Sequence, residues 1–390
     1  MQRRNFIRLI GGGTVVAATS LTGLAGCSSA IPAEAIEAWR GPDAGLANTD
    51  VRRWILSYAI LAPHSHNLQS WVADLRTPGE ITLRCDPTRL LPETDPFNRQ
   101  IVMSHGTFIE LLDMAAKEQG LRADITLFPE GAFGADKIDA RPVARIRLVP
   151  DASVQKDPLF AQVLLRHTNR KAYDLARPVP PTSRAALAAT VKSAPIRVGQ
   201  VGPEDSAAMA QHRRVAKEAW RIELVTPRTV MESFHVLRVG ASEIAQHRDG
   251  ISLTSPMVVA LERLGLFDRT KAPAPDSSAT TGQIKDFNAN LDATPGFVWM
   301  VTPDNSRVTQ IEAGRAWARV QLAATAQGLA MQPLSQALQE YAEQKQMYAD
   351  IHKLAGATRP GETVQMWARV GYAPAVEPAP RRKLQDFVKT

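Results

Sequence analysis

The sequence predicts an α+β protein made of two fused halves. Helix-like and strand-like patterns both occur along residues 51–372. When residues 106–121 are laid over residues 314–329, Gln119-Gly120-Leu121 matches Gln327-Gly328-Leu329, and the alanine-rich stretches before them also align, all at an offset of 208. A chance match between two alanine-rich helices that stop at glycine is the alternative. We favour a duplicated half.

Helix and strand signals in the first half follow one another closely. Apolar residues at helical spacing predict a helix over residues 51–61, which Pro63 ends because it disfavours helical geometry at Ala62. Alternation over Ile81–Cys85 predicts a strand. A long helix is expected from Arg99 to Gln119, with strands at residues 123–128 and 143–149.

The second half repeats this content around a helical insertion. We expect a helix from Ala185, a long helical stretch over Ser206–His247 that Pro227 must break, a strand at Phe297–Val301, the second echo helix over Ile311–Gln327, and a last strand at Met366–Tyr372.

These patterns divide the chain into a leader, a tether and the two halves. The boundaries are 1–26, 27–48, 49–150 and 151–390. Residues 271–295 are rich in Ala, Pro, Ser, Thr and Asp, a composition that marks a connection; a surface linker and a lid are both open readings.

The stretch that carries chemistry follows the first helix. Within six residues, His64 to Gln69, it places a hydroxyl, two imidazoles and two carboxamides. Carboxamides donate and accept at once, as the edge of a flat heterocycle requires. Capping of backbone groups at a helix-to-loop junction is the alternative role.

The loop resembles a motif of the nitroreductase family. Pro63, Ser65, Asn67, Gln69 and Trp71 are similar to its Pro-Ser-x-x-Asn-x-Gln-Pro-Trp loop, with one element shifted and Ser70 in place of the second proline. Spacing and the preceding helix fit the two-in-one, Acg-like branch. The resemblance implies noncovalent FMN, with Ser65, Asn67 and Gln69 at its ring and ribityl chain.

A basic cluster lies between the halves. Residues 164–173 resemble the family's Arg-Arg-Ser-x-Arg signature, which implies that the flavin phosphate and ribityl hydroxyls contact Arg166, Thr168, Asn169 and Arg170. A guanidinium can hold two phosphate oxygens in a fixed fork. The alternative is a solvated basic helix end.

Two later segments complete the implied site. The turn after the second echo helix, at Leu334, Ser335 and Gln336, would offer backbone N–H groups to the flavin nitrogen that accepts hydride. Arg381 and Arg382 resemble the C-terminal basic motif that returns to the phosphate; a solvated charge run is the alternative. Family members draw these parts from two subunits, so a fused pair of halves implies a monomer that acts as a pseudo-dimer, with one flavin per chain.

The resemblance implies an oxidoreductase that passes hydride or electrons from a reduced donor to a flat acceptor of nitroaromatic or quinone type. No side chain need act as a catalytic base, because a reduced flavin carries its own redox chemistry. The alternative is an exported flavin-binding or stress-related protein with little turnover, since NAD(P)H is a cytoplasmic reductant. A structural lipoprotein without ligand is a third possibility.

The N-terminus resembles a twin-arginine export signal that ends in a lipobox. Arg3 and Arg4 precede an uncharged, glycine-rich run from Leu9 that ends in Leu24-Ala25-Gly26-Cys27. We expect cleavage before Cys27, lipidation of its sulfur, and a periplasmic protein anchored to the envelope membrane. A transmembrane anchor is the alternative, but the apolar run is short.

Composition adds exclusions. Residues 1–26 carry three arginines and no acid, so the formal net charge falls from +7 to +4 on cleavage, which argues for no nucleic-acid partner. With Cys27 lipidated, Cys85 has no partner for an intrachain disulfide. The pair His64 and His66 lacks a further clustered ligand, so we predict no metal site.

Overall fold

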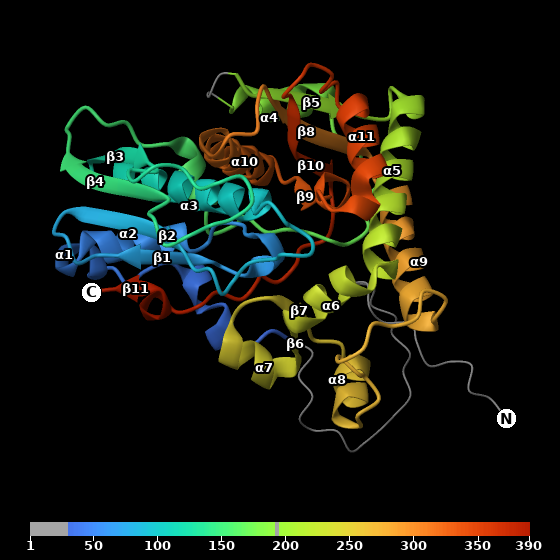
Figure 1. Cartoon of the computed structure of the whole chain (residues 1–390). Coiled ribbons are helices and arrows are strands. Elements are labelled where there is room, and N and C mark those ends of the chain that lie inside the picture. The colour runs from blue at the N-terminus through green and yellow to red at the C-terminus, as the bar shows by residue number, and fades with distance from the viewer. Residues whose placement is uncertain (1–29, 192–194) are drawn as a thin grey trace.

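Two long central helices join two α+β halves in the computed structural model, which describes residues 30–191 and 195–390 (Figure 1). Helix α3 spans Arg99–Glu118 and α10 spans Arg307–Ala326, each with 20 residues. Both ends of α10 lie 208 positions after those of α3, the offset of the sequence echo. The predicted α+β class with two fused halves is confirmed.

Each half has a sheet of the same topology. In the first sheet β1 (Trp71–Asp74), β2 (Glu80–Cys85), β4 (Ala144–Pro150) and β3 (Leu121–Leu127) are antiparallel neighbours in that order. In the second, β5 (Arg197–Val201), β8 (Gly296–Thr302), β10 (Thr363–Gly371) and β9 (Ala330–Pro333) follow the same pattern. Both orders read first, second, fourth and third along the chain, so the repeat includes a helix and its sheet.

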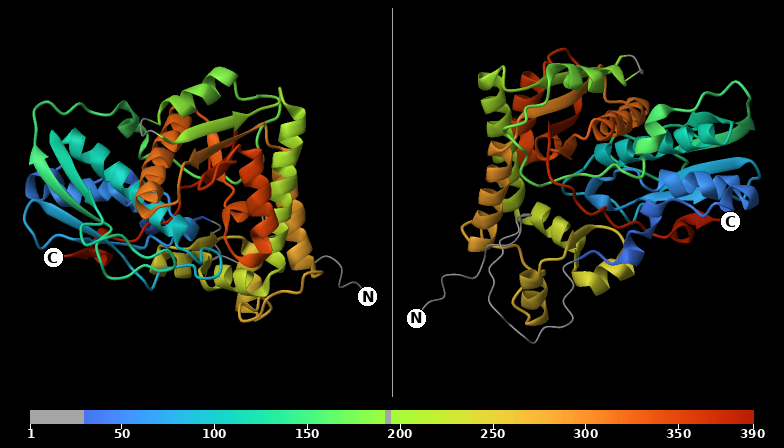
Figure 2. Two further views of the ribbon diagram at one scale, coloured as in Figure 1. Left: turned by 45° about the horizontal axis from the view of Figure 1, so that its top comes forward. Right: turned by 180° about the vertical axis from the view of Figure 1, so that it is seen from behind.

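The C-terminus crosses back to the first half. Strand β11 (Val388–Lys389) pairs in parallel with β1, with Ala73 opposite Val388. Figure 2 shows this segment lying against the first half, away from the strand β10 that precedes it in the chain. This return of the chain brings residues 380–382 to the loop that follows α2 (Val51–Ala59) in the first half.

Two glycines set the contact between the central helices. A Cβ on Gly106 would lie 2.1 Å from the carbonyl oxygen of Ile311, and one on Gly314 would lie 1.9 Å from that of Met103. These four positions are related by the offset of 208, because Gly106 corresponds to Gly314 and Met103 to Ile311. The helices can approach this closely only because both positions lack a side chain.

The second sheet is covered on both faces. Phe297 and Val301 of β8 pack with α5 (Ser206–Val225) and α11 (Lys345–Leu354), whereas Val298 and Met300 pack with α10. This is the two-residue alternation of a strand buried on both sides. In the first half, α2 (Val51–Ala59) and α3 share one core with the sheet.

The insertion of the second half forms its own small core. It contains α6 (Pro227–His235), β6 (Leu237–Val239), α7 (Gly240–His247), β7 (Ile251–Leu253) and α8 (Pro256–Arg263). The break predicted at Pro227 is confirmed, since this residue begins α6. The remaining elements are α4 (Pro181–Ala189), α9 (Ser278–Asp292) and the 3₁₀ turns η3 (Ser65–Asn67), η4 (Pro158–Gln162), η5 (Gln336–Leu338), η6 (Ala342–Gln344) and η7 (Leu384–Asp386).

Two segments expected to be loose are ordered. Residues 271–295 contain α9, which packs along α5 with the Trp220 and Phe287 rings 4.6 Å apart, so this stretch is not a structureless connection. The tether prediction is wrong for residues 33–40, which form η1 (Ala33–Ala35) and η2 (Glu37–Arg40) with Trp39 buried. A short helix α1 (Leu46–Thr49) follows.

The expected signal and the lipidated Cys27 lie outside the described residues. Within residues 30–191 and 195–390, no helix is long and apolar enough to cross a membrane.

Candidate functional site

The loop after α2 has an unusual backbone. His66, Asn67 and Gln69 all have positive φ, at 48°, 53° and 53°. Non-glycine residues rarely adopt this region, and such strain persists only where surrounding contacts impose it. Two contacts from α3 do so: Thr107 Oγ1 donates to the Pro63 carbonyl at 2.8 Å, and Ser104 Oγ accepts from the Ser65 N–H at 3.2 Å.

His64 fixes the loop from inside. Its Nδ1 is 2.8 Å from the Ser65 carbonyl, so it donates there, and its Nε2 is 2.7 Å from Ser70 Oγ. Burial is the main cause that lowers the pKa of His64 to about 3, which keeps the ring neutral at physiological pH. Within the described residues no group of three or more His, Cys, Asp or Glu side chains could hold a metal.

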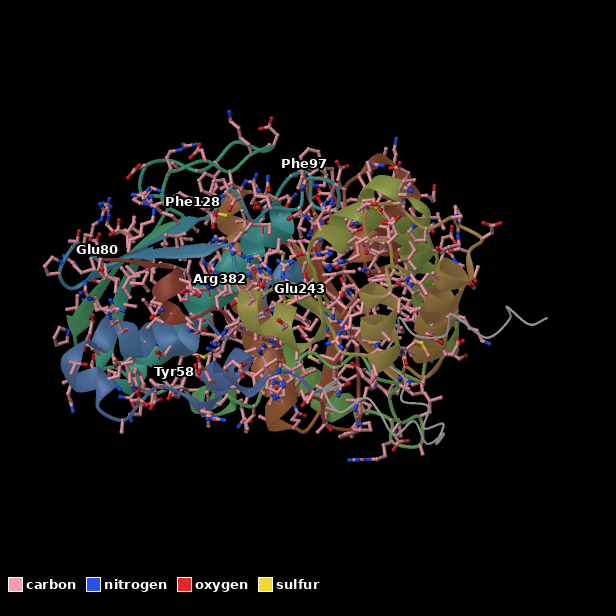
Figure 3. All side chains as sticks on the ribbon, turned by 90° about the horizontal axis from the view of Figure 1, so that it is seen from below. Tyr58, Glu80, Phe97, Phe128, Glu243 and Arg382 are labelled. Atoms are coloured by element: carbon pink, nitrogen blue, oxygen red, sulfur yellow. The ribbon has the colours of Figure 1, made fainter. Side chains whose placement is uncertain are left out.

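The C-terminal segment closes on the loop. Arg382 donates its backbone N–H to Gln69 Oε1 at 2.9 Å, and its guanidinium donates to the Gln69 carbonyl at 3.0 Å. Gln69 Nε2 donates to the Arg248 carbonyl at 2.9 Å, so its buried amide is engaged on both sides. Figure 3 labels Arg382 within the body of the molecule, not in a free tail.

Arg381 braces Asn67 and the end of α2. Its terminal nitrogens donate to Asn67 Oδ1 at 2.9 Å, to the Pro380 carbonyl at 2.9 Å, and to the carbonyls of Leu61 and Ala62 at 3.0 and 3.2 Å. All four terminal N–H groups are thus used. Arg381 orients the loop rather than presenting a free fork to a phosphate.

Arg166 meets Arg381 at a shared acceptor. Its guanidinium donates to the Leu61 carbonyl at 3.1 Å and to Gln321 Oε1 on α10 at 3.0 Å. Burial lowers the pKa of Arg166 to about 10 and lowers that of Arg381, to which the neighbouring Arg166 charge adds. The Nε groups of both are buried and have no hydrogen-bond partner in residues 30–191 and 195–390.

The residues after Arg166 run along the edge of the second sheet. Thr168 bridges to Met331 of β9, and the Asn169 N–H donates to the Met331 carbonyl at 3.0 Å. Asn169 Nδ2 donates to the Pro374 carbonyl at 2.8 Å, and Lys171 Nζ to that of Ala375 at 3.1 Å. The side chains of Asn169 and Lys171 therefore already form hydrogen bonds with the backbone.

Arg170 differs from its neighbours. It is exposed, and within the described residues its guanidinium makes no hydrogen bond or ion pair. Burial nevertheless lowers its pKa, and its charge lowers the pKa of His66, which burial chiefly brings to about 4. The influence of the Arg170 charge on His66 indicates that these two side chains lie near each other.

Sequence reasoning missed Arg369 and Tyr173. Arg369 is fully buried on β10, donates to Gln332 Oε1 at 2.7 Å and to the Lys171 carbonyl at 2.8 Å, and lies 3.9 Å from the Tyr173 ring centre. Burial lowers the pKa of Arg369, and the Arg170 charge lowers it further. A single arginine in a predicted strand gives little signal, although burying one unpaired is costly.

The turn at residues 334–336 reaches the same region from the other half. Leu334 N–H donates to the Trp367 carbonyl at 2.8 Å, which leaves Ser335 and Gln336 as the candidate backbone donors. The following carbonyl of Leu338 accepts from Arg99 at the start of α3, and Gln100 beside it lies 3.5 Å from Ser65 Oγ. The first turn of α3 therefore has η3 and η5 as neighbours.

The site is electrostatically incomplete. In the part of the chain that the structure describes, Arg166, Arg170, Arg369 and Arg381 form no ion pair with a carboxylate. No carboxylate contributes to their pKa shifts: burial lowers all four pKa values, a neighbouring arginine lowers those of Arg369 and Arg381 further, and the Tyr173 phenol opposes the shift at Arg170 and Arg369. Buried charges are normally paired or bound to a counterion. A phosphate group is an anion of suitable charge and geometry.

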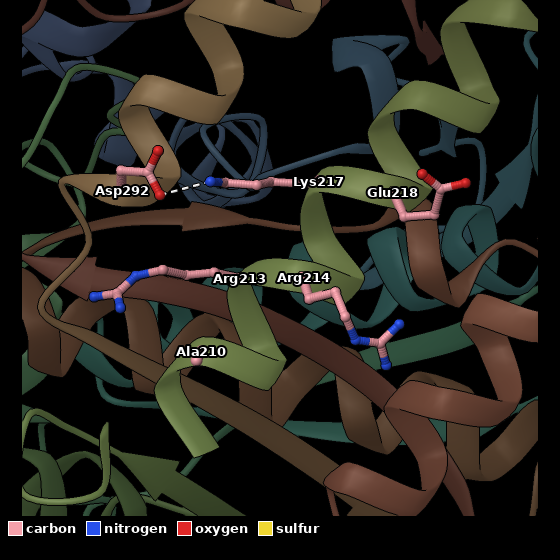
Figure 4. A pocket seen from close by; sticks show the side chains of 6 residues that line it. All are labelled: Ala210, Arg213, Arg214, Lys217, Glu218 and Asp292. Atoms are coloured by element: carbon pink, nitrogen blue, oxygen red, sulfur yellow. Dashed lines mark hydrogen bonds and ion pairs between the residues drawn. The ribbon is translucent and has the colours of Figure 1, made fainter. Parts of the chain in front are cut away.

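A second basic hollow, between α5 and α9, shares none of these residues. Figure 4 shows Lys217 reaching Asp292, at 2.6 Å. Arg214 pairs with Asp350, and Arg213 donates to the carbonyls of Leu291 and Thr294. Two of its three cations, Lys217 and Arg214, are paired with carboxylates, so it is a weaker candidate for an anion site.

Comparisons with known proteins find relatives that are named as nitroreductases. No protein-family model matches the sequence. Two curated proteins named "Putative NAD(P)H nitroreductase", from two strains of Mycobacterium tuberculosis, are each 25% identical over 350 residues, covering 86% of this chain and 90% of theirs.

Solved structures with related chains are more distant. The FMN-dependent nitroreductase NfnB from Mycobacterium smegmatis, in complex with NADPH, shares 16% identity over 59% of this chain and 97% of its own, with a TM-score of 0.36. A nitroreductase with bound FMN from Bacteroides fragilis shares 13% over 58% and 96%, with a TM-score of 0.32. The chain is thus similar, over most of its length and most of theirs, to two mycobacterial proteins named as nitroreductases.

Proposed function

We propose that this protein is an FMN-dependent, nitroreductase-like oxidoreductase whose flavin lies between the two halves. The observation that carries the proposal is the set of guanidiniums at Arg166, Arg170, Arg369 and Arg381, which lack a carboxylate partner within the described residues. The curated relatives named as nitroreductases support the same activity.

The residues fit an anionic, flat cofactor in distinct roles. In the described part of the chain, the Arg170 guanidinium has no hydrogen-bond or ion-pair partner and could hold the phosphate, and the buried Nε–H of Arg166 also has no partner. The Asn67 amide is held at both ends, because Arg381 donates to its Oδ1 and its Nδ2 donates to the Pro380 carbonyl at 3.1 Å. Its second N–H and second oxygen lone pair would face a heterocycle edge in one orientation. Ser335 and Gln336 would supply backbone donors.

When bound, FMN supplies the redox chemistry through its own ring system. The residues of this chain bind, orient and shield it. Neutral His64 and His66 add no charge near the ring at physiological pH, because burial lowers the pKa values to about 3 and about 4. The acceptor class is a flat molecule such as a nitroaromatic or a quinone.

We extend the proposal to assembly. The equal strand orders and the common helix offset support a monomer that acts as a pseudo-dimer within the two-in-one, Acg-like branch. The strained loop and Arg166–Arg170 occur once each, so the chain would hold one flavin.

The sequence alone supports export by the twin-arginine route and lipid anchoring at Cys27 in the periplasm. The rival function, a flavin-binding or stress-related protein with little turnover, follows from that location, where NAD(P)H is not the available reductant.

Reoxidation kinetics test the activity. The purified chain is reconstituted with FMN, reduced chemically, and mixed with a nitroaromatic or a quinone in a stopped-flow instrument. We expect flavin reoxidation to accelerate with acceptor concentration. Reoxidation no faster than in buffer would favour the rival function, and a chain that retains no FMN would contradict the proposal itself.

A further inference from the structure

The N-terminal segment, residues 30–41, contacts two parts of the chain that hold the candidate site, the C-terminal segment and the insertion. The Arg381 N–H donates to the Ala35 carbonyl at 2.8 Å, and Trp39 Nε1 donates to the Ala379 carbonyl at 2.8 Å. Arg248 accepts from the Gln69 side chain through its backbone carbonyl, and its guanidinium forms an ion pair with Glu37 at 2.7 Å. The segment is therefore integrated into the fold.

Trp39 lies against both buried arginines. Its ring centre is 4.8 Å from the Arg381 guanidinium carbon and 5.7 Å from that of Arg166, and its ring meets the His167 ring edge-on at 5.1 Å. The indole is 9% exposed, so the contact is largely shielded from water. The face of an aromatic ring attracts a cation, and more strongly where water is excluded.

No described carboxylate neutralises these two guanidiniums, so the indole face is the stabilising partner on that side. If it is lost, Arg381 gains freedom to leave Asn67 Oδ1 and the carbonyls of Leu61 and Ala62, and Arg166 loses its fixed position. A charge that is not held in place binds an anion more weakly, because ordering it costs conformational entropy.

We propose that Trp39 is a positioning residue of the cofactor site, and that the N-terminal segment completes this site by holding Arg166 and Arg381 against its indole face. The inference rests on the proposed function, because its readout is FMN binding. It also means that removing residues 1–41 produces a chain with weakened FMN affinity although both sheets remain.

Fluorinated tryptophans at position 39 test the contact without changing its shape. Successive fluorine atoms weaken the negative face of the ring and leave its volume nearly unchanged. We expect the FMN Kd, measured by quenching of flavin fluorescence, to rise stepwise with fluorine number and to reach about tenfold at the end of the series. An unchanged Kd across the series would overturn the proposal.

Substitutions provide the second arm. Trp39→Leu should raise the Kd by about tenfold or more, whereas Trp39→Phe, which keeps an aromatic face, should recover most of the affinity. Trp54→Leu is the matched control. Trp54 packs on Tyr58 and Phe160 in the same core, and among the described residues no arginine lies over its ring. Its loss should therefore lower the melting temperature and leave the FMN Kd unchanged.

Failures of the two proposals are distinguishable. If the unsubstituted chain binds no FMN, the proposed function fails. If it binds FMN and the Trp39 and Trp54 variants lose affinity equally, Trp39 acts only through general stability and the inference fails.

Discussion

Arg170 and Arg381 are both predicted by sequence to meet the flavin phosphate, but their contacts predict opposite effects of substitution. Arg170 makes no hydrogen bond or ion pair with the residues that the structure describes, so Arg170→Ala should remove only an interaction with the ligand. One charge-assisted hydrogen bond is worth about 1.5–3 kcal/mol, which corresponds to a rise in FMN Kd of about 10-fold to 150-fold. The free energy of unfolding of the apoprotein should change by no more than about 0.5 kcal/mol.

Arg381→Ala should act mainly on stability. It leaves the Ala62 carbonyl and Asn67 Oδ1 without this donor, whereas the carbonyls of Leu61 and Pro380 keep bonds from Arg166 and from Asn67 Nδ2. The loop thereby loses its brace. Unsatisfied buried acceptors outweigh the relief of one buried charge, so we expect a loss of about 2–4 kcal/mol.

Two titrations on each variant separate the roles. FMN fluorescence quenching gives the Kd, and urea unfolding of the apoprotein gives the free energy of unfolding. Arg170→Lys is the conservative control and should recover part of the affinity through its charge without the planar fork. The reasoning is refuted if Arg170→Ala binds FMN as tightly as the unsubstituted chain, or if it destabilises the apoprotein as much as Arg381→Ala.

Three further predictions concern packing, pH and export. Gly314→Ala places a methyl group 1.9 Å from the Met103 carbonyl oxygen, so the free energy of unfolding should fall by roughly 3 kcal/mol or more and the melting temperature should drop. Gly45→Ala is the control and should be neutral, because nothing lies within 4 Å of the added methyl group. Equal melting temperatures of the two variants would contradict the close helix crossing. Burial raises the pKa of Glu223 to about 7, so the folded chain retains a proton that the unfolded chain releases near pH 4.5. The free energy of unfolding should therefore fall by up to about 3 kcal/mol as the pH rises from 4.5 to 7. Urea unfolding of Glu223→Gln should show a flatter pH dependence, and an unchanged slope would contradict the assignment. Replacing Arg3 and Arg4 together by Lys should leave flavin-loaded precursor in the cytoplasm, as fractionation would show, and normal maturation of this variant would refute the export proposal.

Periodicity predicted the elements well because their signals are local. The echo of Gly120 and Gly328 predicts two helices that stop at a glycine, and both glycines do follow a helix with positive φ, at 67° and 66°. The second helix begins at Arg307, before the predicted start at Ile311, so its length was underestimated. The equal strand orders could not be predicted, because pairing depends on contacts between segments far apart in the chain.

The candidate site was only partly accessible to sequence reasoning. The motif loop, the Arg166 cluster and the C-terminal arginines do come together, and Leu61 accepts from both Arg166 and Arg381. Small and polar neighbours predict a tether around Trp39, yet Trp39 and Ala35 are buried and fix an otherwise exposed or half-buried segment against the fold. Arg369 gave no signal, because its partners Gln332 and Lys171 lie far from it in the sequence.

Native mass spectrometry of the chain from which residues 1–29 have been removed, saturated with FMN, tests the central claim most directly. One chain should carry one FMN, and Arg170→Ala should lose this adduct at a lower ligand concentration than the unsubstituted chain. A chain that carries no FMN at saturation, or one that carries two, would contradict a single flavin site between the halves.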